Sequence, residues 1–91
     1  MPETPFTVEL PDGSIRACYS PSSVVKDYFS TGQTLPTEEF VALSRTALTE
    51  ASERVRAKFG YACTAASASL HDIEAWASEL DPGATLTVIH I

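Results

Sequence analysis

The chain has 91 residues, 44% of them apolar, and a net charge of −6. That length suffices for a single α+β domain over residues 1–91 with one hydrophobic core, and the composition is not that of a disordered protein. The negative charge argues against a protein that binds nucleic acid or an anionic membrane surface. No stretch approaches the roughly twenty apolar residues of a membrane span.

The first five residues, Met1 to Pro5, have neither the basic start nor the apolar segment of a secretory signal peptide. We therefore expect a cytoplasmic protein. In that compartment Cys18 and Cys63 are expected to be reduced thiols and not a disulfide.

A β-hairpin is predicted at the N-terminal end. Two segments of alternating apolar and polar residues, 6–10 and 14–19, flank Asp12-Gly13, a dipeptide typical of two-residue type I′ turns. Such a turn would pair Phe6, Val8 and Leu10 with Tyr19, Ala17 and Ile15 on one apolar face. It would place Cys18 on the opposite face, across from Thr7.

The next segment predicts a short amphipathic helix that ends near Gly32. Ser20 is a suitable N-cap and Pro21 fits the first helical position. A loop over residues 32–36 would then lead to the strongest helix signal in the chain, from Thr37 to Gly60. Apolar residues recur there at three- and four-residue spacing, Thr34 or Thr37 would cap the start, and Gly60 would cap the end.

A second long helix is expected at least from Ser67 to Leu80, followed by a break at 81–83 and a last strand over 84–91. That strand has apolar residues on both faces, so it is not expected at a fully exposed edge. The predicted order is therefore β-β-α-α-α-β. The predicted α+β fold is a three-stranded sheet in the order 2-1-3, with two long antiparallel helices on one face.

No catalytic motif is present in the sequence. The four glycines fit turns and caps, and none belongs to a phosphate loop, a dinucleotide fingerprint or a nucleophile elbow. The two cysteines and two histidines lack metal-ligand spacing, so neither a metal nor another cofactor is expected. Near pairs of carboxylates, such as Glu50 and Glu53, are typical of a solvated helix face.

Three groups of residues are candidate binding sites. The first is a corner between sheet and helices that could hold a small ligand, although its serines also suit a simple strand-to-helix turn. The second is a basic group that complements the end of the long helix or binds an anion or an acidic partner. The third is the apolar face of the short helix, a possible interface. In that order they comprise Cys18, Tyr19, Ser20, Ser22, Tyr61 and Cys63; Arg54, Arg56 and Lys58; and Val24, Val25, Tyr28 and Phe29.

Three segments together resemble a known family. They are residues 6–13 (FTVELPDG), 18–22 (CYSPS), and 45–56 leading into 59–64 (FGYACT). The chain resembles small mycobacterial-type nitrogen-starvation response proteins over nearly its whole length. This resemblance implies a gene cluster with a nitrilase and a radical-SAM protein, linked with nitrile assimilation, and it implies no catalytic residues.

These observations favour a non-catalytic accessory or adaptor protein that acts through protein–protein contacts. Its partner would be another protein of the same cluster or a second copy of itself in a homodimer. The alternative is a small-ligand-binding module or minor enzyme that uses the corner near Tyr19 and Cys63. A DNA-binding regulator is a third reading, and the negative charge argues against it.

Overall fold

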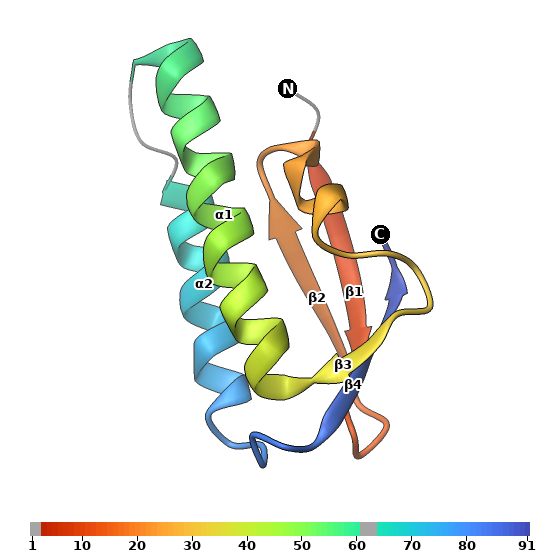
Figure 1. The fold of residues 1–91 in the computed structure, drawn as a ribbon. Coiled ribbons are helices and arrows are strands. Elements are labelled where there is room, and N and C mark those ends of the chain that lie inside the picture. The colour runs from red at the N-terminus through yellow and green to blue at the C-terminus, as the bar shows by residue number, and fades with distance from the viewer. Residues whose placement is uncertain (1–2, 61–63) are drawn as a thin grey trace.

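The computed structural model describes residues 3–60 and 64–91, and it shows an α+β fold. A four-stranded antiparallel sheet, in the order β2-β1-β4-β3, has two helices on one face. The helices lie side by side and run in opposite directions (Figure 1). The elements are β1 (Thr4–Glu9), β2 (Ile15–Ser20), the 3₁₀ helix η1 (Ser23–Asp27), β3 (Thr34–Pro36), α1 (Thr37–Phe59), α2 (Thr64–Ala77) and β4 (Thr85–His90).

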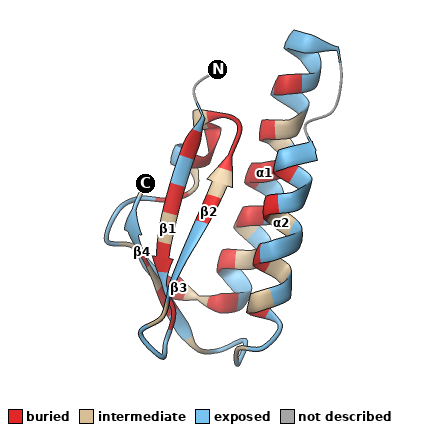
Figure 2. Ribbon diagram, turned by 180° about the vertical axis from the view of Figure 1, so that it is seen from behind, coloured by how far each residue is buried: buried red, intermediate tan, exposed pale blue. Residues whose placement is uncertain are grey.

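The hydrophobic core lies between the sheet and the helix pair. The buried residues of α1 recur about once per turn, and those of β1 alternate along the strand (Figure 2). A row of aromatic rings crosses this core: Phe6 stacks on Phe29, Phe29 packs on Phe40, and Phe40 packs on Trp76. The ring centroids are 5.9, 5.1 and 5.9 Å apart. The row includes residues of β1, of the segment after η1, and of both α-helices, so its ring contacts hold the helix pair against the sheet.

The long helix is confirmed over the predicted residues. Gly60 adopts a left-handed conformation, with φ of 81°, and its N–H donates to the carbonyl of Arg56. The expected cap at the start was wrong, because neither Thr34 nor Thr37 caps the helix with its side chain; Pro36 is the N-cap. The N–H groups of Thr37 and Glu38 donate instead to the carbonyls of Ala84 and Pro82, and this satisfies two of the donors that a helix start leaves open.

The hairpin is present, but its predicted register was wrong by one residue. Phe6 pairs with Cys18 and Thr7 with Ala17. The turn has three residues, and Gly13 takes a left-handed conformation with φ of 89°. The two-residue turn would have needed an N–H from Pro11, which has none. A one-residue shift turns every side chain to the other face, so Cys18 is buried in the core and Ala17 is exposed.

Two elements between β2 and α1 also differ from the prediction. The loop expected over residues 32–36 contains a fourth strand, β3, which pairs with β4. The expected short helix is a 3₁₀ helix, and its N-cap is Ser22, whose hydroxyl accepts a hydrogen bond from the N–H of Val24. Over residues 3–60 and 64–91 there are therefore four strands and two α-helices, in place of the three strands and three helices predicted.

The last strand lies beside β1, as predicted, and β3 covers its other edge. Leu86 and Val88 face the core, and β4 is an inner strand. The second long helix runs from Thr64 to Ala77. Its start agrees with the prediction of a helix at least from Ser67, and its end comes before the predicted Leu80. Within the described residues, neither helix has the combination of length and apolar character that crossing a bilayer requires.

Candidate functional site

The outer edge of β2 lies beside α2, and the two elements form a groove. Residues are paired alternately across an antiparallel ladder, so every second residue of an edge strand directs its N–H and C=O away from the sheet. The N–H of Leu10 donates to the carbonyl of Ser14, so Ser14 is a position that bonds to β1. Every second residue after Ser14 bonds to β1 in the same way. Arg16 and Cys18 therefore bond to β1, whereas Ile15, Ala17 and Tyr19 direct their backbone groups toward the groove.

One hydrogen bond closes the groove at the end formed by Tyr19 and Ser69, which we call its upper end. The N–H of Tyr19 donates to the hydroxyl of Ser69 on α2, with 3.2 Å between nitrogen and oxygen. From that contact the axes of β2 and α2 diverge toward Ile15 (Figure 2). Among the described residues, no hydrogen bond from α2 reaches the outward backbone groups of Ile15 or Ala17. Two residues of β2 thus present a strand edge that is ready to pair.

Two adjoining cavities, of about 350 and 400 Å³, occupy the groove. Both are lined by Ala17, Asp72 and Trp76, so they form one continuous depression. The remaining lining residues are mostly small or apolar: Ile15, Arg16, Cys18, Tyr19, Ala65, Ala68, Ser69, Ile73 and Ala75. Short alanine side chains on α2 leave the space that a longer side chain would fill.

Asp72 supplies the negative charge of the groove. It is exposed on α2 and lines both cavities. Burial, together with the smaller effect of the nearby Asp72 carboxylate, raises the pKa of the Cys18 thiol to about 12. Cys18 is therefore a neutral, buried thiol at physiological pH and not an activated nucleophile.

The predicted corner is only partly assembled. Cys18 and Tyr19 line the upper end of the groove. Ser20 and Ser22 are buried and hold the strand-to-helix turn: the Ser20 hydroxyl donates to the carbonyl of Ser22 and accepts from its N–H. Tyr61 and Cys63 lie outside the described residues.

The apolar face of the predicted short helix lies inside the molecule. Val24, Val25 and Phe29 are buried, and Val25 and Phe29 belong to the main core. Tyr28 is half-buried, and its hydroxyl donates to Glu50 of α1 at 2.6 Å. That bond raises the pKa of Tyr28. This face therefore offers no exposed interface, because α1 already covers it.

The basic group lies on the exposed last turns of α1. Arg54, Arg56 and Lys58 are all exposed, and Arg54 forms an ion pair with Glu50, one turn earlier, at 3.5 Å. Lys58 lies over the ring of its neighbour Phe59. These cations suit the negative end of the helix dipole.

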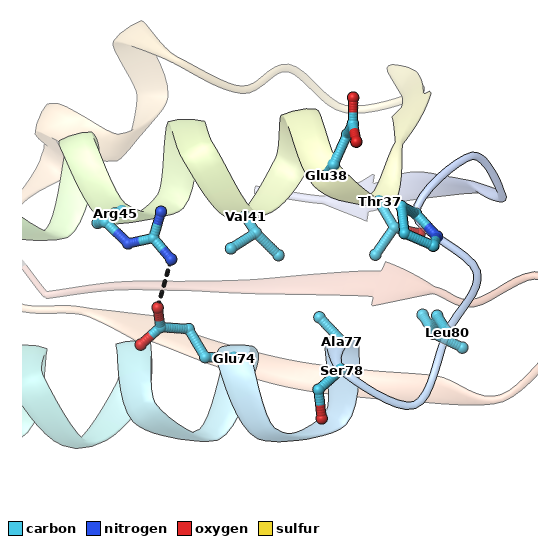
Figure 3. A pocket seen from close by; sticks show the side chains of 9 residues that line it. Thr37, Glu38, Val41, Arg45, Glu74, Ala77, Ser78 and Leu80 are labelled. Carbon is cyan, nitrogen blue, oxygen red and sulfur yellow. Dashed lines mark hydrogen bonds and ion pairs between the residues drawn. The ribbon is translucent and has the colours of Figure 1, made fainter.

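A second depression, of about 490 Å³, lies between the start of α1 and the end of α2 (Figure 3). Arg45 and Glu74 point toward one another across it and form an ion pair. Val41, Ala77 and Leu80 give it an aliphatic lining. The Arg45 charge is already neutralised by Glu74, and both side chains are about half exposed, so this pair contributes roughly 0–1 kcal/mol to stability.

The residues that the sequence analysis associated with metal or nucleophilic chemistry are scattered. His71 and His90 are both exposed. In the ranges 3–60 and 64–91, no three or more histidine, cysteine or acidic side chains converge in a way that could hold a metal ion.

Most of the groove residues carry no distinctive signal in the sequence. Ser69, Asp72 and Trp76 were assigned to an ordinary helix, and Ile15 and Ala17 to a buried hairpin face. The run of Ala and Ser at the start of α2 was the available signal, since small side chains mark a face that something approaches closely. Ala65, Ala68 and Ser69 of that run lie toward β2, whereas Ala66 and Ser67 lie toward α1.

Fold and groove together define a small α+β protein whose antiparallel sheet exposes part of one strand edge beside a helix. The chain belongs to the nitrogen starvation-induced protein NitG family, whose model matches residues 5–91. No curated protein and no solved structure gives a significant match.

Proposed function

We propose that this protein is a non-catalytic adaptor in the response to nitrogen starvation, and that it binds another protein through the groove between β2 and α2. The family assignment supports the physiological context. The observation that carries the molecular part is the exposed backbone edge of β2 at Ile15 and Ala17, beside an open depression. Strand edges of this kind are a common means of recognising a partner chain.

The partner class follows from the resemblance noted above. An enzyme encoded in the same nitrile-assimilation gene cluster is the first candidate, and a second copy of this chain is the other. The alternative of a small-ligand module or minor enzyme has less support. Its thiol is buried with a raised pKa, and the hydroxyls of Ser20 and Ser22 are occupied by backbone groups.

The groove can be tested with a matched pair of substitutions. Ala68 lines the groove, whereas Ala57 is an exposed helical alanine outside it. Arginine has a high helix propensity, so Ala68→Arg and Ala57→Arg leave both helices intact while only the first fills the groove. Tagged wild-type protein and both variants would be purified from nitrogen-starved cells and their bound proteins identified by mass spectrometry.

We expect a stoichiometric partner with the wild type and with Ala57→Arg, and its loss with Ala68→Arg. Retention of the partner by Ala68→Arg would place the interface elsewhere. Recovery of the wild type as a partnerless monomer, with its mass measured by light scattering, would contradict the adaptor function itself.

A further inference from the structure

We propose that the groove binds its partner as an extended peptide strand that pairs with β2 at Ile15 and Ala17 and places a cationic side chain against Asp72. This inference rests on the proposed adaptor function and specifies the chemistry of the partner. The structure supports it through the backbone of β2, the shape of the groove and its charge.

The backbone supplies the binding groups. Ile15 and Ala17 each direct one N–H and one C=O toward the groove, so an added strand could form up to four main-chain hydrogen bonds there. The neighbouring Arg16 and Cys18 use their own backbone groups in the ladder to β1. The edge is therefore already held in the extended geometry that strand addition requires, and the partner alone has to be ordered.

The shape of the groove favours one chain over a second sheet. The Tyr19–Ser69 hydrogen bond fixes α2 beside β2 at one end, and the groove opens toward Ile15 and Ala75. A second copy that paired through its own β2 would bring its β1 along with it, and the sheet would continue into the space beside α2. A single extended segment needs only a narrow space beside β2, and the two cavities of about 350 and 400 Å³ lie there.

The charge of the groove selects the side chain. Asp72 lines both cavities, whereas Arg16 lines only the one that includes Ile15, so the cavity beside Ala68 has the Asp72 carboxylate as its one charged lining residue in the described ranges. Among the described residues, no ion pair holds Asp72. The chain as a whole carries −6, which adds attraction for a basic segment. Trp76 beside Asp72 offers an aromatic surface to the stem of a lysine or arginine. The small residues Ala68 and Ala75 leave room for the rest of the peptide.

The hydrogen bond that the N–H of Ala17 would donate to the peptide can be removed without disturbing the hairpin. Proline at position 17 removes an N–H that points into the groove and takes no part in the β1 ladder, which edge strands tolerate. Ala17→Thr is the matched control, because it keeps that N–H in a residue suited to strands. Asp72→Asn removes the charge, and Asp27→Asn removes a comparable exposed charge outside the groove.

The probe is a random twelve-residue peptide library displayed on phage and selected against the full-length protein. The best selected peptide would be labelled with fluorescein and titrated by fluorescence anisotropy against the wild type and the four variants. Thermal melts and amide NMR spectra would establish that each variant is folded.

We expect enrichment of lysine or arginine in the selected peptides and amide shifts centred on Ile15, Ala17 and Asp72. Ala17→Pro should weaken binding at least about tenfold, because a buried partner carbonyl loses its donor. Ala17→Thr also adds side-chain bulk at this position but keeps the N–H, so it should weaken binding clearly less than Ala17→Pro. Asp72→Asn should weaken binding about threefold, and Asp27→Asn should have no effect.

Selection of no peptides, selection of acidic peptides, or equal binding to folded Ala17→Pro would overturn the inference. Failure of this inference can be distinguished from failure of the proposed adaptor function. If the cellular partner is lost with Ala68→Arg but kept with Ala17→Pro, the adaptor uses the groove without strand addition. If a second copy binds in place of a peptide, the molar mass measured in solution will rise from that of the monomer to that of the dimer as the protein concentration increases. That result also contradicts the inference.

Discussion

Replacement of Phe40 by alanine is expected to destabilise the protein by about 3–5 kcal/mol, the usual cost of removing a large ring from a closed core. Phe40 is fully buried and packs between the rings of Phe29 and Trp76. Its loss would leave a cavity where α1, α2 and the segment after η1 meet. Chemical denaturation followed by circular dichroism measures the change in the free energy of unfolding.

Phe59 is the control for that substitution, because it lies on the same helix with 53% of its surface exposed. Phe59→Ala should change the free energy of unfolding by less than about 0.5 kcal/mol. Equal effects of the two substitutions would mean that the aromatic row does not hold the helix pair to the sheet.

Two serines that are equally buried should respond in opposite ways to alanine. The hydroxyl of Ser20 bonds to both the N–H and the carbonyl of Ser22, which is itself buried. Ser20→Ala would leave those backbone groups without partners, and the expected cost is about 1–3 kcal/mol. Thermal and urea denaturation of the variant measure this loss.

Ser44 provides the opposite case on α1. Its hydroxyl is fully buried and has no hydrogen-bond partner within the described part of the chain. Ser44→Ala should therefore leave stability unchanged or raise it by up to about 1 kcal/mol, since it removes an unsatisfied polar atom and adds helix propensity. A loss of stability as large as that of Ser20→Ala would show that the Ser44 hydroxyl has a partner.

Elements with a strong local signal could be predicted from the sequence. The helix from Thr37 to Phe59 follows from a long apolar period and from a glycine that ends it in a left-handed conformation. The last strand follows from its β-branched residues and lies beside β1 as predicted. The predicted order 2-1-3 left it at an edge of the sheet, however, and pairing with β3 makes it an inner strand. The signals for the helix and for the strand lie within the elements themselves, so no knowledge of distant contacts was needed to predict them.

The errors arose where one residue, or a distant contact, decides the outcome. The missing N–H of Pro11 selects a three-residue turn and turns Cys18 inward. β3 has three residues, one of them proline, and is defined by its pairing with β4. The apolar residues Val24, Val25 and Phe29 looked like an interface, because an apolar period does not reveal which element covers it.

The groove could not be predicted for the same reason. Its lining comes from β2 and α2, which are more than forty residues apart in the chain, and its character depends on which β2 residues face outward. The predicted register turned the side chains of Ala17 and Tyr19 into the core, and no pattern within residues 14–19 shows that α2 lies beside the β2 edge. The corner residues Cys18 and Tyr19 were singled out, and they lie at one end of the groove.

Amide hydrogen exchange of the free protein shows whether the β2 edge is open, because it reports the state of each backbone N–H along the strand. If the edge is open, the N–H groups of Ile15 and Ala17 exchange rapidly. Exchange should be at least about a hundredfold slower at Arg16 and Cys18, which bond to β1, and at Tyr19, which bonds to Ser69. Protection of Ile15 and Ala17 equal to that of Arg16 and Cys18 would mean that the β2 edge is already covered, and it would contradict the account.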